Sequence, residues 1–347
     1  MRARLIYVAA RAGVAPNTAS TILNNRPDSW ASAETRARVI QAAADLGYRP
    51  SKAALGIRLG RFRSVGLVVP DLHNPYYTTF ADLIDKALKA EGYDLIIEHS
   101  HNTLAQEKHC FDAILDRQVD GAIFFVTDTN LHRPFLEGLA QRKFPAVALA
   151  AKPEVPLPVD AVLVDFSDGV AEAVDHLVGL GHRRLAFLCA LAEGQEDGHR
   201  PELFRRLLAD HGIPPDNMTF VRCSHEIASA RQAFRAMLQE RRSGLPSAVI
   251  ALNDLSAIGA MRAAIDEGLL VPRDLSVIGV DNIPLGEHLP VALSTIAQPI
   301  EDMARRAVSI LLKRINEPRP GKPTSMVFST ELLLRESTAR APGKPIK

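Results

Sequence analysis

The chain of 347 residues is too long for one ordinary hydrophobic core, so two or three domains are expected. Its 47% hydrophobic and 23% charged residues are typical of a globular protein. No apolar run approaches the ~20 residues that a membrane span requires, and the N-terminus lacks a signal-peptide pattern. The three cysteines form no CxxC pair, which argues against a disulfide framework or a cysteine zinc site and favours a cytoplasmic location.

Charge is distributed unevenly along the chain. Residues 1–63 contain 11 Lys and Arg against 3 Asp and Glu, a net charge of +8, whereas the remainder carries −7. A small basic segment attached to an acidic remainder is typical of a protein that meets a polyanion at one end. A solvated basic surface without a partner is the alternative. The helix pattern within residues 1–63 is needed to distinguish the two interpretations.

Three helices are predicted within residues 1–49. The first, Ile6–Ala12, ends at Gly13; the second begins at Pro16; and the third runs from Ser32, a candidate N-cap, to Gly47. The predicted inner residues are Val8, Ala9, Ala12, Ala19, Ile22, Leu23, Val39, Ile40, Ala43 and Leu46. Two short helices across a glycine-containing turn, braced by a third, form a helix-turn-helix unit, although a plain three-helix bundle is also compatible with the pattern.

The rest of the chain alternates between strand and helix patterns. Strands are predicted at 64–69, 94–100, 121–126, 183–190, 247–253 and 276–281, and helices at 76–91, 104–117, 201–211 and 255–267. Continuous apolar strands separated by amphipathic helices predict parallel sheets that are covered on both faces. The span is long enough for two such sheets.

Three blocks of sequence carry a family resemblance. "VAARAGVAPNTASTILNN", "SAETRARVIQAAADLGYRPS" and "GLVVPDLHNPYY" resemble, in order and spacing, the head, brace helix and first strand of the Lac-repressor-like (LacI/GalR) transcription regulators. Further matches extend the resemblance over nearly the whole chain. It implies an all-α helix-turn-helix head followed by a periplasmic-binding-protein-like α/β body of two doubly wound parallel-sheet lobes.

The resemblance also implies a domain plan. The expected segments are a DNA-binding head at 1–49, a hinge at 50–63, an effector-binding and dimerisation body at 64–340 and a loose tail at 341–347. Within the body, lobe 1 is expected at about 64–160 plus 295–325, and lobe 2 at about 161–294 plus 326–340.

In this family the second helix lies in the major groove of DNA. That placement implies Pro16, Asn17 and Thr21 as the principal base-reading residues. An asparagine amide can form a bidentate pair with adenine, and threonine can contact a thymine methyl group. Capping of the helix start remains an alternative role for Asn17. The further residues implied for DNA binding are Arg4, Tyr7, Thr18, Ser20, Asn24, Ile57 and Arg58.

Some of these positions depart from the family pattern. Ala15 replaces the usual hydroxyl N-cap, Thr21 replaces a common arginine, and Arg4 and Tyr7 replace the usual Thr and Asp. In the hinge, Ile57 holds the place of the apolar side chain that wedges into a minor-groove step. The operator sequence therefore does not follow from the resemblance.

Ligand chemistry is expected where parallel strands end, in the crevice between the lobes. The residues implied for the effector site are Tyr76, Tyr77, Asp165, Phe166, Arg200, Asn253 and Asp281. Asp281 and Arg200 can bind opposite ends of a hydroxylated ligand, and the tyrosines supply flat faces. The family implies a sugar, a sugar acid or a sugar phosphate as effector.

No catalytic or cofactor site is expected. The chain has no GxGxxG after a strand, GxxxxGK[ST], GxSxG or HExxH, and the "HSH" at 99–101 is interpreted as a surface pair without metal. The family resemblance therefore implies a non-enzymatic, homodimeric repressor of carbohydrate-related genes that binds operator DNA and a small-molecule effector, with a tetramer as the alternative assembly. A solute-binding protein without a DNA role and an enzyme with an accessory DNA-binding head are the rival hypotheses.

Overall fold

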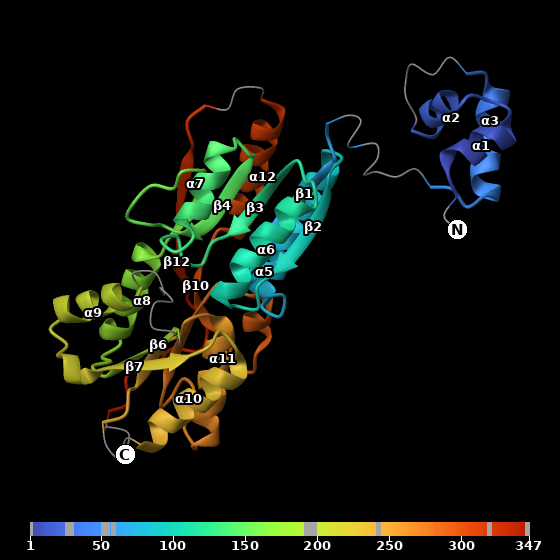
Figure 1. Cartoon of the computed structure of the whole chain (residues 1–347). Coiled ribbons are helices and arrows are strands. Elements are labelled where there is room, and N and C mark those ends of the chain that lie inside the picture. The colour runs from blue at the N-terminus through green and yellow to red at the C-terminus, as the bar shows by residue number, and fades with distance from the viewer. Residues whose placement is uncertain are drawn as a thin grey trace. The chain divides into compact units, whose positions relative to one another are not determined.

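The computed structural model describes residues 3–24, 31–49, 56, 60–190, 200–240, 244–317 and 321–343. The chain divides into two compact units, residues 1–63 and residues 64–347 (Figure 1). Most of the predicted hinge, including Ile57 and Arg58, lies outside the described residues.

The N-terminal unit contains α1 (Leu5–Ala12), α2 (Pro16–Leu23) and α3 (Ala33–Asp45). Gly13 ends α1 with φ 66°, a left-handed conformation that glycine adopts without a steric penalty. The Ser32 side chain accepts a hydrogen bond from the amide of Thr35 and caps α3, as predicted. The core of this unit consists of Val8, Ala9, Ala12, Ala19, Ile22, Val39, Ala42 and Ala43.

The prediction that Ile40 lies in the core of the head is wrong. Ile40 is 53% exposed, whereas Ala42 and Ala43 are buried beside Val39. The buried face of α3 follows the 3–4 residue spacing of a helix, and Ile40, one residue after Val39, points about 100° away from that face. Leu23 and Leu46 pack at the margin of the core and are partly buried.

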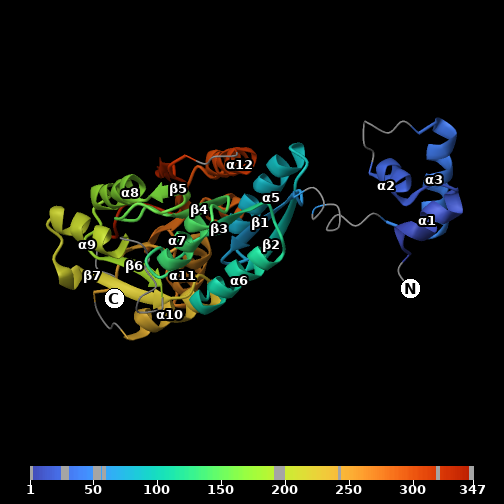
Figure 2. The same ribbon diagram turned by 45° about the horizontal axis from the view of Figure 1, so that its top comes forward.

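The first lobe of the body is a parallel sheet of order β11-β5-β4-β3-β1-β2. Its strands are β1 (Ser64–Val69), β2 (Asp94–His99), β3 (Gly121–Phe125), β4 (Ala146–Ala151), β5 (Asp160–Asp165) and β11 (Ser325–Ser329). One face is covered by α5 (Pro75–Ala90) and α12 (Ile300–Asn316), and the other by α6 (Leu104–Asp116) and α7 (Arg133–Gln141) (Figure 2).

The second lobe is a sheet of order β12-β10-β9-β8-β6-β7, in which only β12 runs antiparallel to its neighbour. Its strands are β6 (Leu185–Ala190), β7 (Met218–Cys223), β8 (Ala248–Ile250), β9 (Ser276–Val280), β10 (Ser294–Ala297) and β12 (Glu331–Leu333). One face packs against α8 (Ser167–Gly179) and α9 (Arg200–Asp210), and the other against α10 (Ile227–Glu240) and α11 (Asp254–Asp266). Two 3-10 turns lie at Pro215–Asn217 and Pro284–His288.

Strand pairing corrects the expected lobe boundaries. β5 and β11 pair with each other in the first sheet, so residues 161–165 and 326–329 belong to lobe 1. β10 pairs with β9, so residues 295–297 belong to lobe 2. The chain therefore passes between lobes at Phe166, Gln298 and Thr330. The sequence of a short apolar strand does not indicate which sheet the strand joins, because sheet membership depends on the neighbouring strand with which it forms hydrogen bonds.

The C-terminal segment is attached to the second lobe. Ser337 accepts a hydrogen bond from the Val277 amide (2.8 Å), and the Ala341 amide donates to the Leu180 carbonyl (2.9 Å). The tail that the sequence predicts to be loose from residue 341 is thus held at its first residue. Residues 344–347 lie outside the described part of the chain.

Candidate functional site

The outer face of α2 carries the residues predicted to read DNA. Asn17 is exposed, and α2 begins after Ala15 without a side-chain hydrogen bond at its cap. Asn17 therefore does not cap α2 through its side chain, which was the alternative role. Its amide group is available to a partner, which is the condition for reading a base edge.

Polar residues at the end of α2 and at its C-cap, Asn24, interact within the head. The Thr21 hydroxyl donates to the Asn17 carbonyl (2.9 Å), and Asn24 Nδ2 donates to the Ser20 carbonyl (2.7 Å). Asn24 thus braces the end of α2, whereas Thr21 presents its methyl group and an acceptor oxygen. Pro16 is exposed, and Thr18 and Ser20 are partly buried.

The remaining predicted DNA contacts lie near α1 and in the hinge. Arg4 precedes the first turn of α1, and Tyr7 is 51% exposed on that helix. Ile57 and Arg58 are among the residues that the structure does not describe.

A cavity opens between the two lobes, where strands of both sheets end. It encloses about 1080 Å³ of space unfilled by protein atoms, part of it open to solvent. Tyr76, Tyr77, Phe166, Arg200, Asn253 and Asp281 all line it. These six side chains are brought together from segments far apart in the sequence, because the carboxyl ends of the strands face each other across the crevice.

A chain of hydrogen bonds crosses the cavity floor. The Tyr76 hydroxyl donates to Gln298 Oε1 (3.0 Å), and Gln298 Nε2 donates to Asp281 Oδ1 (2.8 Å). Asn74 Oδ1 accepts from the Tyr76 amide (3.0 Å) and so fixes the start of α5. This chain links the first lobe, the crossover at Gln298 and the second lobe.

Asp281 lies in an unusual electrostatic environment. It is 7% exposed, and the pKa of its carboxyl is raised from 3.8 to about 8. Burial is the main cause and the nearby Asp254 carboxyl the second, and together they outweigh the opposite effects of Arg200, Gln298 and Asn74. A carboxyl that changes charge near neutral pH can donate as well as accept hydrogen bonds in the cavity.

This pKa predicts a pH-dependent stability difference. Between about pH 4 and pH 8 the unfolded chain ionises Asp281 whereas the folded protein keeps it protonated, so wild type loses stability as the pH rises through this window. Asp281→Asn has no such loss and should gain stability relative to wild type across the window, then stay constant above it. Urea unfolding of both proteins at pH 4 to 9 measures the difference; a pH-independent difference would exclude a raised pKa at Asp281.

Arg200 and Phe166 form one wall of the cavity. The guanidinium carbon of Arg200 lies 4.9 Å from the centroid of the Phe166 ring, in cation–π contact. Arg200 Nη1 also donates to the Leu252 carbonyl (2.8 Å). These two contacts hold the guanidinium group of Arg200 at the cavity wall.

Asn253 lines the cavity but also has a structural role. Its Oδ1 accepts from the Ser256 amide (2.8 Å), while Ser256 Oγ accepts from the Asn253 amide (2.9 Å), which forms a capping box at the start of α11. Asn253 Nδ2 donates to the His225 carbonyl (3.3 Å). A ligand can therefore use only the remaining hydrogen-bonding capacity of this side chain.

Asp165 lies outside the cavity, contrary to expectation. It borders a neighbouring groove, where it pairs with Lys152 (2.8 Å) and accepts a hydrogen bond from the Ser167 amide (3.0 Å). These hydrogen bonds lower the pKa of Asp165 to about 2. It serves as a local turn and ion-pair residue at the start of α8.

Several residues that line the cavity are not among the seven implied for the effector site: Asn74, Thr127, Asp128, His225 and Gln298. Thr127 and Asp128 directly follow the predicted strand at 121–126, so the strand-end rule could have found them. His225 follows β7, a strand that the sequence pattern did not indicate. Burial, and secondarily Arg200, lowers the pKa of His225 to about 4, so it is neutral at pH 7.

Within the described ranges, no cluster of three or more His, Cys, Asp or Glu could hold a metal ion. The His99 and His101 rings lie 4.0 Å apart. No helix in the part of the chain that the structure describes is long and apolar enough to span a membrane.

These features define a class of protein in which a helix-turn-helix head is joined to a two-lobed α/β ligand-binding body. The profile of the bacterial regulatory proteins of the lacI family matches residues 5–51, and that of the periplasmic binding protein-like domain matches residues 174–338. The chain is 30% identical to the HTH-type transcriptional regulator DegA of Bacillus subtilis over 98% of its length and 99% of that protein. It therefore belongs to the LacI family and is a DNA-binding transcriptional regulator.

Two solved structures are similar in fold. A LacI family regulator from Enterococcus faecium with bound ribose shares 28% identity, with a TM-score of 0.69 over 80% of this chain and 99% of that one. The Lac repressor dimer bound to operator and the anti-inducer ONPF covers 98% of this chain and 100% of that one, with a TM-score of 0.79 and 24% identity. The predicted family, fold class and DNA-binding function are thus confirmed. DegA is a transcriptional regulator, which favours a non-enzymatic role over an enzyme with an accessory DNA-binding head.

Proposed function

We propose that this regulator is a homodimeric repressor whose operator affinity is controlled by a neutral sugar bound in the cavity between the lobes. The charge of the cavity carries the proposal. Among its described lining residues, Arg200 is the single cation at pH 7, whereas Asp128 and Asp281 supply two carboxyls. The raised pKa of Asp281 keeps its carboxyl mainly protonated at pH 7, so Arg200 and Asp128 leave the cavity without an excess positive charge for a phosphate or a sugar acid. The protonated Asp281 carboxyl can still donate a hydrogen bond to a neutral hydroxyl.

The hydrogen-bonding groups suit hydroxyls. Asp281 accepts hydrogen bonds from a hydroxyl and Arg200 donates to one, so neighbouring hydroxyls of one sugar can satisfy both. Tyr77 and Phe166 supply apolar ring surface for the faces of a sugar ring. The ribose bound by the similar Enterococcus faecium regulator supports the same ligand class.

A thermal-shift screen tests this proposal with matched triplets, such as ribose with ribose 5-phosphate and glucose with gluconate and glucose 6-phosphate. A neutral sugar at 100 times its Kd should add about 2.7 kcal/mol to the unfolding free energy and raise Tm. Stabilisation by the phosphates or sugar acids alone would overturn the neutral-ligand proposal.

The exposed amide of Asn17 leads to a second prediction. Asn17→Ala should weaken binding to the preferred operator by about 1–3 kcal/mol and relax the preference at one A·T base pair. Binding to a set of single-base operator variants measures this. Asn24→Ala, which loses only the brace to Ser20, should weaken binding to all variants alike, and the same uniform loss for Asn17→Ala would show that Asn17 does not read a base.

A further inference from the structure

The turn that carries Asp281 is held along its backbone. The Asp281 amide donates to the Ile296 carbonyl (3.0 Å), the Asn282 amide to Thr295 Oγ1 (3.2 Å), and the Ile283 amide to Asp254 Oδ2 (2.7 Å). Three successive backbone amides are thus bound to groups of the second lobe. These hydrogen bonds fix the backbone of the turn from which the Asp281 side chain extends.

The turn needs this restraint because its conformation is unfavourable. Asp281 has φ 106° and Asn282 has φ 57°, both in the positive range that residues with a side chain adopt reluctantly. Strained backbone of this kind persists only where the surrounding structure holds it, and it often occurs at ligand sites.

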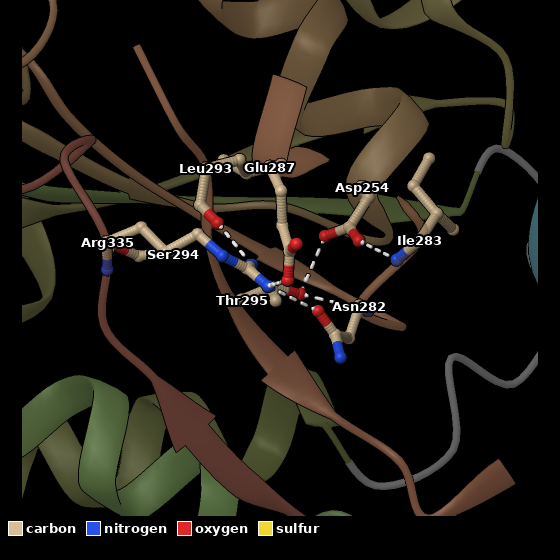
Figure 3. Close-up of polar contacts among 8 residues, drawn as sticks. All are labelled: Asp254, Asn282, Ile283, Glu287, Leu293, Ser294, Thr295 and Arg335. Carbon is tan, nitrogen blue, oxygen red and sulfur yellow. Dashed lines mark hydrogen bonds and ion pairs between the residues drawn. The ribbon is translucent and has the colours of Figure 1, made fainter. Parts of the chain in front are cut away.

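Asp254 is the centre of the restraint (Figure 3). It is 1% exposed at the start of α11, and its second oxygen, Oδ1, accepts from the Thr295 hydroxyl (2.7 Å). One carboxyl therefore binds the Ile283 amide directly and orients the hydroxyl that binds the Asn282 amide. A Cβ at Gly279 would lie 2.0 Å from Asp254 Oδ1, so the carboxyl reaches this place only because residue 279 is glycine.

Arg335 adds an outer layer to the same network. Its Nη2 donates to Asn282 Oδ1 (2.7 Å) and pairs with Glu287 (2.6 Å), while Nη1 donates to the Leu293 carbonyl (2.7 Å) (Figure 3). The Asn282 side chain is therefore fixed as well as its amide. None of these groups lines the cavity.

We propose that Asp254 is a positioning residue for effector binding, which acts through Thr295 and the Ile283 amide to hold the turn that presents Asp281 to the cavity. This inference rests on the proposed function of the cavity. A carboxyl at the first position of α11 also stabilises that helix through its dipole, which is a purely structural role. The two roles differ in what the loss of Thr295 does, because Thr295 lies outside α11.

Amide hydrogen exchange of the full-length, ligand-free protein tests the positioning directly. Thr295→Val removes the hydroxyl at nearly constant volume, and Thr295→Ser, the matched control, retains it. The Asn282 and Ile283 amides should exchange about tenfold faster in Thr295→Val and at the wild-type rate in Thr295→Ser. Amides of α5 in the first lobe should be unaffected in both variants. Unchanged exchange at Asn282 and Ile283 in Thr295→Val would overturn the proposal.

Sugar affinity provides the functional arm, with ribose, glucose and galactose as probes. The probe that binds wild type most tightly should bind Thr295→Val about tenfold more weakly, with wild-type affinity recovered in Thr295→Ser. Asp254→Asn should weaken binding similarly if it folds; Thr295→Val keeps the test valid if it does not. If no probe binds wild type, the proposed sugar function fails, while the exchange rates still decide whether Asp254 and Thr295 hold the turn.

Discussion

Asp281→Ala is expected to lower the affinity for the neutral sugar about 100-fold while leaving the operator affinity of the ligand-free protein unchanged. A neutral hydrogen bond contributes about 0.5–1.5 kcal/mol, and a buried polar group left without its partner costs about 1–3 kcal/mol. The substitution removes the Asp281 carboxyl that lines the cavity, so the loss of the bond and the unsatisfied sugar hydroxyl add together. Calorimetric titration of the sugar and operator-binding measurements without sugar provide the two numbers.

Asp165→Ala is the matched control for this variant. Asp165 is also an aspartate at the end of a strand, but it lies outside the cavity and pairs with Lys152. Its loss should leave sugar affinity within about twofold of wild type, since exposed ion pairs contribute little. An equal loss of affinity in both variants would mean that the sugar binds elsewhere in the crevice.

Operator binding is expected to weaken by about 10³-fold or more as salt rises from about 50 to 200 mM, if ~6 phosphates are contacted. The +8 charge of residues 1–63 is the physical reason, because each neutralised phosphate releases condensed counterions. Fluorescence anisotropy on a labelled operator duplex at several salt concentrations measures the slope.

Asn17→Ala is the control for the salt dependence. It removes no charge, so the slope of affinity against salt should equal that of wild type even though the absolute affinity falls. A nearly flat slope for wild type would contradict electrostatic attachment of the head to DNA.

The sequence was sufficient to predict the helical head and the two-sheet α/β body, but not the full order of strands within each sheet. Glycine and proline at the helix ends and the spacing of Val8, Ala19 and Val39 predicted the head correctly, apart from Ile40. In the body the alternation of apolar strands with amphipathic helices predicted two covered parallel sheets. The sheet to which β5, β10 and β11 belong could not be predicted, because that choice depends on partners far away in the sequence.

The candidate site was predictable where residues follow a strand that the pattern indicates. Asn253 and Asp281 end such predicted strands and line the cavity. Arg200, which the family resemblance implies, lies there together with Phe166. Asp165 ends β5, a strand that the sequence pattern did not indicate, and its side chain turns to Lys152 and Ser167. Side-chain direction at a strand end depends on local partners, which the sequence does not specify.

The class of ligand that suits the cavity could not be predicted without the three-dimensional structure. The proposed preference for neutral ligands follows from the balance of Arg200 against Asp128, together with the neutral states of Asp281 and His225 at pH 7. None of these four side chains is informative alone. The support of the Asp281 turn by Asp254 likewise depends on Thr295, which comes from a different strand.

The most direct test of the central claim is the affinity of the full-length protein for an operator selected from a random DNA pool, measured with and without the neutral sugar that stabilises it. Saturating sugar should change the operator Kd of wild type by about 5–150-fold, the range typical of allosteric coupling, and leave the Kd of Asp281→Ala unchanged. An operator Kd of wild type that is the same with and without saturating sugar would contradict the account.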